Sequence, residues 1–192
     1  MDFGAMLNRL IRAARLDANL YEEVEADTSL TQEAFTAVAI VAALSGIGAG
    51  LKSLIGGAGV GGFFVALFVG ILVSLAGYVI WAFLTYFIGV RLFKGTADYG
   101  ELLRTLGYAY GPNVLGLVAF IPVIGPLLSF VGSIWALLCF VVAVRQALDF
   151  DTTKAVLTVI IGWFVVLVIT LMITAILGVG AIGLGVLSGG LR

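Results

Sequence analysis

Histidine is absent from the 192 residues, and charged residues make up only 11% of them, against about 25% in ordinary soluble domains. Without histidine the chain lacks the commonest metal and haem ligand and the usual general base. The single cysteine, Cys139, lies inside an apolar run, which excludes a disulfide framework and predicts a packing role. A net charge of −1 gives nucleic acid nothing to bind. We therefore expect no cofactor, no metal and no nucleic-acid partner.

The chain contains long stretches without any charged residue. Four of them are present, at positions 34–51, 53–90, 105–144 and 155–191. A helix needs roughly 20 apolar residues to cross about 30 Å of hydrocarbon. A Lys, Arg or Asp at the bilayer centre costs about 2.5–3.5 kcal/mol on insertion scales. The pattern predicts a helical integral membrane protein.

Glycine and proline divide the two longest stretches. The glycine cluster at 56–62 predicts a loop, and Pro122, Gly125 and Pro126 predict a tight hairpin turn, because these residues interrupt helices. We expect an all-α, polytopic membrane helix bundle with five transmembrane helices, near residues 34–51, 63–90, 102–120, 126–145 and 155–177. They form a domain over residues 31–178, and residues 179–192 form a glycine-rich tail too short to cross again.

Residues 3–15 predict an amphipathic helix within a cytoplasmic N-terminal region, residues 1–30, that ends in an acidic linker. Its apolar residues share one side, and Arg9, Arg12 and Arg15 share the other. Such a helix lies in the membrane interface with its arginines toward anionic headgroups. The same apolar side would equally suit a helix packed on the loops of the bundle, so the sequence leaves both positions open.

The distribution of lysine and arginine orients the five predicted helices. Eight of these residues fall on the side of the N-terminus, whereas only Lys52 and Arg192 fall on the other. Basic residues stay on the cytoplasmic side of a membrane. The N-terminus is therefore expected inside the cell and the C-terminus outside.

Few residues in the predicted spans have polar chemistry. Tyr108, Tyr110, Pro112 and Asn113 form the main group, and a proline kink beside an amide can line a site or a pore. We favour the alternative, in which Pro112 only shapes the helix while the polar side chains tie helices together. No charged residue lies deep in any span, which argues against ion-coupled transport and against an enzyme.

The loops on the N-terminal side hold the remaining polar groups, which are the surface available to a cytosolic partner. These residues are Arg91, Lys94, Asp98, Glu101, Arg104, Arg145, Asp149, Asp151 and Lys154.

Several short segments, in order and spacing, resemble the Yip-domain family of five-span membrane proteins, over about residues 30–178. The segments are Thr31-Gln32-Glu33-Ala34, residues 93–99 (Phe-Lys-Gly-Thr-Ala-Asp-Tyr), residues 106–112 (Leu-Gly-Tyr-Ala-Tyr-Gly-Pro), residues 121–126 (Ile-Pro-Val-Ile-Gly-Pro), Trp135, Arg145-Gln146-Ala147 and Thr153-Lys154-Ala155. The resemblance implies a cytosolic N-terminus and a role that is not enzymatic. The short N-terminal region is similar to the compact bacterial branch, so the Rab-binding role of eukaryotic relatives is not carried over.

Three functions compete on this basis. The first is a scaffold or membrane-organising protein of the bacterial inner membrane, which binds the lipid bilayer and a membrane-protein partner or a second copy of itself. The second is an accessory subunit of a larger membrane complex, such as a respiratory, photosynthetic or secretion complex. The third is a channel or carrier for a small neutral or lipidic solute at the Pro112–Asn113 kink.

Overall fold

The computed structural model describes the backbone of residues 2–189 and the side chains of residues 2–169, 171 and 172. In these residues every regular element is helical, which confirms the predicted all-α class. In chain order they are α1 (Phe3–Ala14), α2 (Ala18–Ala26), the 3-10 turn η1 (Thr28–Leu30), α3 (Thr31–Ser53), the π-helical turn η2 (Leu54–Ala58), α4 (Gly59–Phe93), α5 (Tyr99–Ala109), the 3-10 helix η3 (Gly111–Val118), α6 (Ile124–Ala147) and α7 (Thr152–Gly189).

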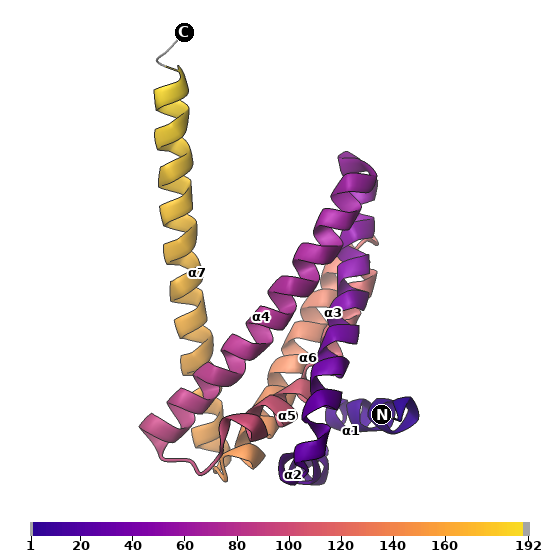
Figure 1. Ribbon diagram of the computed structural model, residues 1–192, viewed down its shortest axis with the longest axis vertical. Coiled ribbons are helices and arrows are strands. Elements are labelled where there is room, and N and C mark those ends of the chain that lie inside the picture. The colour runs from indigo at the N-terminus through magenta and orange to yellow at the C-terminus, as the bar shows by residue number, and fades with distance from the viewer. Residues whose placement is uncertain (1, 190–192) are drawn as a thin grey trace.

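Three stretches of the described chain are long and apolar enough to cross a membrane: Thr28–Phe93, Ile124–Ala147 and Thr152–Ile169. The first contains both α3 and α4, which fold back on each other at η2 and pack side by side (Figure 1). The reversal uses Gly57 and Gly59, whose φ angles of 90° and 66° disfavour any residue with a Cβ.

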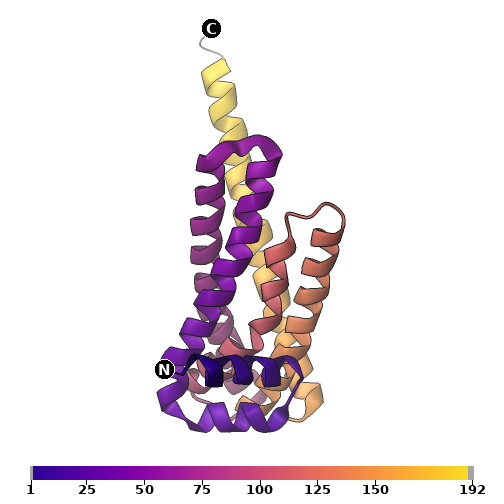
Figure 2. The same cartoon turned by 90° about the vertical axis from the view of Figure 1, so that its right-hand side faces the viewer.

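The short helix α5 lies at the centre of the lower end of the bundle. Its residues from Leu102 to Ala109 are all buried, and it contacts α1, α2, α3, α4 and α6. At 11 residues α5 is about 16 Å long, too short to cross the hydrocarbon alone. The α5–η3–α6 hairpin accordingly ends lower than the α3–α4 hairpin (Figure 2). The core therefore lies at the end of the molecule where α5 sits.

The predicted helix at 102–120 is interrupted. The α-helix ends at Ala109, and the chain continues as the 3-10 helix η3, in which the N–H of Asn113 donates to the carbonyl of Tyr110 at 3.1 Å. Pro112 explains the change, because it has no N–H and its ring does not fit an α-helix interior. The predicted single helix was wrong in this respect.

Three other boundaries also differ from the sequence prediction. The glycine cluster is only partly a turn, since α4 already begins at Gly59. The reversal before α6 occupies residues 119–123, so Pro122 lies in it but Gly125 and Pro126 belong to the first turn of α6. Proline is tolerated there because first-turn N–H groups have no helical partner. Likewise α7 continues to Gly189, beyond the predicted end near 177, and Arg192 lies outside the described residues.

Helices α1 and α2 lie side by side across the lower end of the long helices (Figures 1 and 2). Asp2 begins α1 by accepting hydrogen bonds from the N–H groups of Gly4 and Ala5. On the apolar side of α1, Met6 is buried against the bundle, whereas Phe3 and Leu7 stay 63% and 48% exposed. The helix thus packs on the bundle and still presents apolar surface outward.

Candidate functional site: the base of the bundle

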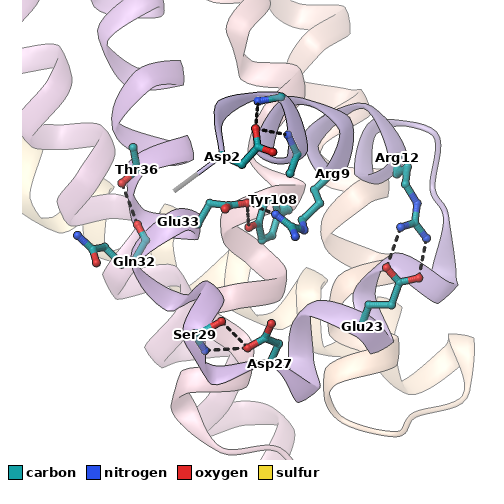
Figure 3. A network of polar contacts seen from close by, with 12 residues as sticks. Asp2, Arg9, Arg12, Glu23, Asp27, Ser29, Gln32, Glu33, Thr36 and Tyr108 are labelled. Carbon is teal, nitrogen blue, oxygen red and sulfur yellow. Dashed lines mark hydrogen bonds and ion pairs between the residues drawn. The ribbon is translucent and has the colours of Figure 1, made fainter.

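Most polar groups of the described chain gather at one end, which we call the base. It consists of α1, α2, α5, the first turn of α3, the residues 94–98 and 148–151, and the adjoining ends of α4 and α6. Its first cluster joins three helices through Glu33 of α3 (Figure 3). One carboxylate oxygen of Glu33 lies 2.5 Å from Arg9 of α1 and accepts a hydrogen bond from the Tyr108 hydroxyl of α5 at 2.7 Å. Glu33 also lies in the first turn of α3, where the helix dipole favours a negative charge.

A second cluster closes the turn between α1 and α2. Arg12 donates to Asp17 at 2.7 Å and, through two nitrogens, to both oxygens of Glu23 at 2.7 and 2.9 Å. Hydrogen bonds from Arg12 hold the pKa of both carboxyls below the usual range. The site is open to solvent, so these pairs fix the angle between the helices more than they stabilise the fold.

Arg104 fastens α2 to the core. Its side chain is buried, and its Nε donates to the backbone carbonyl of Val24 at 3.0 Å. A terminal guanidinium nitrogen donates to the carbonyl of Glu25. These carbonyls belong to the last turn of α2, where backbone carbonyls have no N–H donor within the helix. The negative end of the helix dipole lies at the same turn. A cation at this position therefore caps α2 from a helix about 80 residues away in sequence.

The end of α1 is held from α6. The indole N–H of Trp135 donates to the carbonyl of Ala14 at 2.7 Å, and the carbonyl of Ala13 accepts from the Tyr21 hydroxyl at 3.2 Å and from the Cys139 thiol at 3.5 Å. Burial raises the pKa of Tyr21 well above its ordinary value, so this hydroxyl stays a donor. Side chains of α2 and α6 thus bind the last carbonyls of α1, of which that of Ala13 also accepts the backbone N–H of Leu16 at 2.9 Å.

Glu25 is the one carboxyl of the base whose charge is poorly compensated among the described residues. Its Oε2 atom is buried and has no hydrogen-bond partner. Burial, followed by the negative charges of Glu101, Glu22 and Asp149, raises its pKa to about 7, and the nearby Arg104 only partly offsets this.

Glu25→Gln should make the stability of the protein less sensitive to pH. A pKa raised from 4.5 to about 7 means that the folded protein binds a proton that the unfolded chain releases, so wild-type stability falls as the pH rises between these values. The variant should be more stable than the wild type at pH 8, by about 1 kcal/mol after solvent screening, and equal to it at pH 5. Thermal unfolding in mild detergent measures the difference, and a gain of equal size at both pH values would contradict the assignment.

The predicted lipid-facing arginines do not share one environment. Arg9 and Arg12 are engaged by carboxylates of the chain itself, whereas Arg15 is exposed and makes no ion pair within the described residues. The arginine side of α1 therefore faces Glu33, Asp17 and Glu23.

The predicted polar kink is a packing feature in the structure. Tyr108 is fully buried on Glu33, and the Asn113 amide donates to the carbonyl of Tyr110 at 3.0 Å. The backbone carbonyl of Asn113 accepts from Ser45 of α3 at 2.7 Å. Tyr110 is half-buried against the core, and Pro112 is buried. Tyr108 and the backbone of Asn113 thus join different helices, whereas the Asn113 amide bonds within its own segment.

Most predicted partner-loop residues lie at the base, but several have local structural roles. Asp98 and Glu101 form a capping box at the start of α5, and Asp151 accepts from the N–H of Lys154 at the start of α7. Asp149 accepts a hydrogen bond from Thr96 at 2.7 Å, joining the two loops, and Lys154 lies over the ring of Phe150.

One of the predicted partner-loop residues does not lie on the surface. Arg104 is buried under α2 and is not available to a partner. Arg91, Lys94 and Arg145 remain exposed and make no ion pair among the described residues.

Sequence reasoning missed three residues that organise the base. Glu33, Trp135 and Tyr78 were not predicted as site residues, although the Tyr78 hydroxyl donates to the carbonyl of Leu103 and so joins α4 to α5. A glutamate directly before a charge-free stretch was the available signal for Glu33. Nothing in the sequence points to the distant partners of Trp135 or Tyr78. In the described part of the chain no three His, Cys, Asp or Glu side chains come together as a metal site.

These features define a class, a multi-pass helical membrane protein with a polar base beneath apolar helices. The Yip1 domain model matches residues 18–188, so the chain belongs to the Yip1 domain family, as the sequence resemblance predicted. The match begins at α2, and α1 precedes it. Comparisons with curated proteins and with solved structures gave no match.

Proposed function

We propose that the protein is a non-catalytic membrane scaffold that presents its base as a binding surface to a partner protein. The observation that supports this is the way the base is built: hydrogen bonds of Glu33, Arg104 and Trp135 cross-link α1, α2, α3, α5 and α6. A surface fixed by hydrogen bonds from five helices loses little conformational entropy when a partner binds.

The proposed topology has five crossings, formed by α3, α4, the α5–η3 segment, α6 and α7. The base lies in the cytoplasm of a bacterial cell, since eight of the ten lysines and arginines belong to the N-terminal side. The third and fourth segments enter the membrane less deeply than α3 and α4, because Tyr108 near the end of α5 already lies at Glu33 of the base and the eight residues of η3 add only about 16 Å (Figure 2).

Exposed charges of both signs make up the surface offered to a partner. Its exposed cations without an ion pair among the described residues include Arg91, Lys94 and Arg145, and the outer side of α2 adds Glu22 and Asp27. Exposed charges of this kind set association rate and specificity more than the strength of binding.

The test is recovery of partner proteins from the native membrane after charge reversal at the base. A Lys94→Glu/Arg145→Glu variant should lose the co-purifying proteins that the wild type retains in mild detergent, at unchanged expression. Lys52→Glu is the matched control, because Lys52 is exposed near the opposite end of α3. Equal recovery from both variants would reject the base as the binding surface.

Native electrophoresis of the wild type separates the remaining functions. A small homo-oligomer, or a complex lost only in the base variant, supports a scaffold. A large complex that survives both variants favours an accessory subunit held through apolar helix faces. Solute flux through reconstituted vesicles that Asn113→Leu abolishes would favour a carrier.

A further inference from the structure

An apolar cavity of about 340 Å³ lies between α1 and the bundle. Its walls come from one side of α1, from the middle of α3, from η3 and from Trp135 of α6. Lining residues from the four walls include Leu10, Leu44, Val114 and Trp135. No charged side chain lines it, and the one polar group of Trp135 already donates to Ala14.

The lining decides what kind of molecule fits. Water requires two to four polar partners in a cavity, and this one offers none. A peptide would bring backbone N–H and C=O groups that find no partner, and a helix about 10–12 Å wide is too large for the volume. A flexible hydrocarbon chain has neither difficulty.

The depth of the cavity matches one leaflet. Glu33 marks the polar base on α3, and the lining residue Leu44 lies 11 residues further along the helix, about 16 Å away. Half of a hydrocarbon core of about 30 Å is 15 Å. The cavity thus extends from the level of α1 to about the middle of the membrane, the depth that an acyl chain of that leaflet occupies.

A basic residue next in sequence to a lining residue indicates the headgroup. Ala14 lines the cavity, and the next residue, Arg15, is exposed with no ion pair in the described part of the chain. Arg9 and Arg12 are neutralised by Glu33, Asp17 and Glu23. Arg15 is therefore the cation of α1 that remains available to a lipid phosphate.

We propose that this cavity is a binding site for one acyl chain of an anionic phospholipid, whose headgroup phosphate lies at Arg15. The lipid completes the packing of α1, because it covers the exposed parts of Leu7 and Ile11, which line the cavity and are 48% and 44% exposed. The site is independent of the partner surface of the base and does not require the scaffold proposal to be correct.

Trp135 supplies the reporter for the test. A Trp81→Phe/Trp163→Phe variant retains Trp135 as its single tryptophan, beside the cavity. Reconstitution compares phosphatidylcholine vesicles that hold the same small fraction of either brominated phosphatidylglycerol or brominated phosphatidylcholine. Brominated phosphatidylglycerol should quench Trp135 with about fivefold higher apparent affinity than brominated phosphatidylcholine. This factor corresponds to the binding free energy that one basic side chain contributes at an anionic surface.

Two pairs of variants identify the site in this background. Val114→Phe fills the cavity and should abolish the saturable quenching, whereas Val69→Phe, at a 52% exposed position of α4, should not. Arg15→Gln should remove the preference for phosphatidylglycerol, whereas Arg91→Gln should keep it. Arg15→Gln is a surface change, so its result stands even if the filled variant folds poorly.

Four outcomes would overturn the proposal. Equal quenching by the two brominated lipids would exclude a binding site for the headgroup. Quenching that Val114→Phe leaves unchanged, in a variant with wild-type unfolding temperature, denies the cavity. Competition by water-soluble glycerol phosphate alone would show a phosphate site without a chain, and quenching lost at high protein-to-lipid ratio would show that a second copy occupies the cavity.

Discussion

Arg104→Met should destabilise the protein by about 2–4 kcal/mol, the largest loss expected from any single change at the base. Arg104 is 4% exposed and donates to the carbonyls of both Val24 and Glu25. Methionine keeps much of the volume but leaves those carbonyls without their donors and α2 without a cation at its negative end. Charge-assisted hydrogen bonds are worth about 1.5–3 kcal/mol each, and a buried acceptor left unpaired adds its desolvation cost.

The buried thiol of Cys139 allows the loss of stability in Arg104→Met to be measured. It is the only cysteine, and it lies at the contact between α6 and α1. Labelling by a fluorogenic maleimide during heating in mild detergent therefore reports unfolding. Arg145→Met is the matched control, because Arg145 is exposed near the end of α6. Equal unfolding temperatures for the two variants would mean that Arg104 does not hold α2.

Gly48→Ala should destabilise the protein by about 1–3 kcal/mol, although alanine is the better helix former. A Cβ at Gly48 would lie 2.7 Å from the carbonyl carbon of Leu117, and closer still to the oxygen of Gly116. These are backbone atoms of η3, so no side chain can rotate away. The substitution must therefore push η3 away from α3, because these two helices contact each other.

Gly77→Ala in α4 provides the opposite case. A Cβ there has no heavy atom within 4 Å, so only the helix propensity changes. That variant should be as stable as the wild type or more stable, by up to about 1 kcal/mol. The same thiol-labelling assay compares the two, and a loss of stability of similar size in both would show that η3 does not approach Gly48 closely.

The sequence alone determined the class of protein and most of its long helices. Charge-free runs of more than 30 residues, such as 53–90, leave no alternative to burial in hydrocarbon, because each charge at depth is costly. Most of each of the helices α3, α4, α6 and α7 falls in these runs. Local chemistry suffices for such features, since hydropathy and helix capping act over one or two turns.

Only the tertiary structure decided what the base is made of and where the cavity lies. Tyr108 meets Glu33 across 75 residues of sequence, and Trp135 meets Ala14 across 121. Arg104 resembles any other loop arginine in the sequence, yet packing turns it inward as the cap of α2. Hydrogen bonds between distant helices depend on how those helices pack. The hydropathy of one helix carries no information about which helices lie beside it.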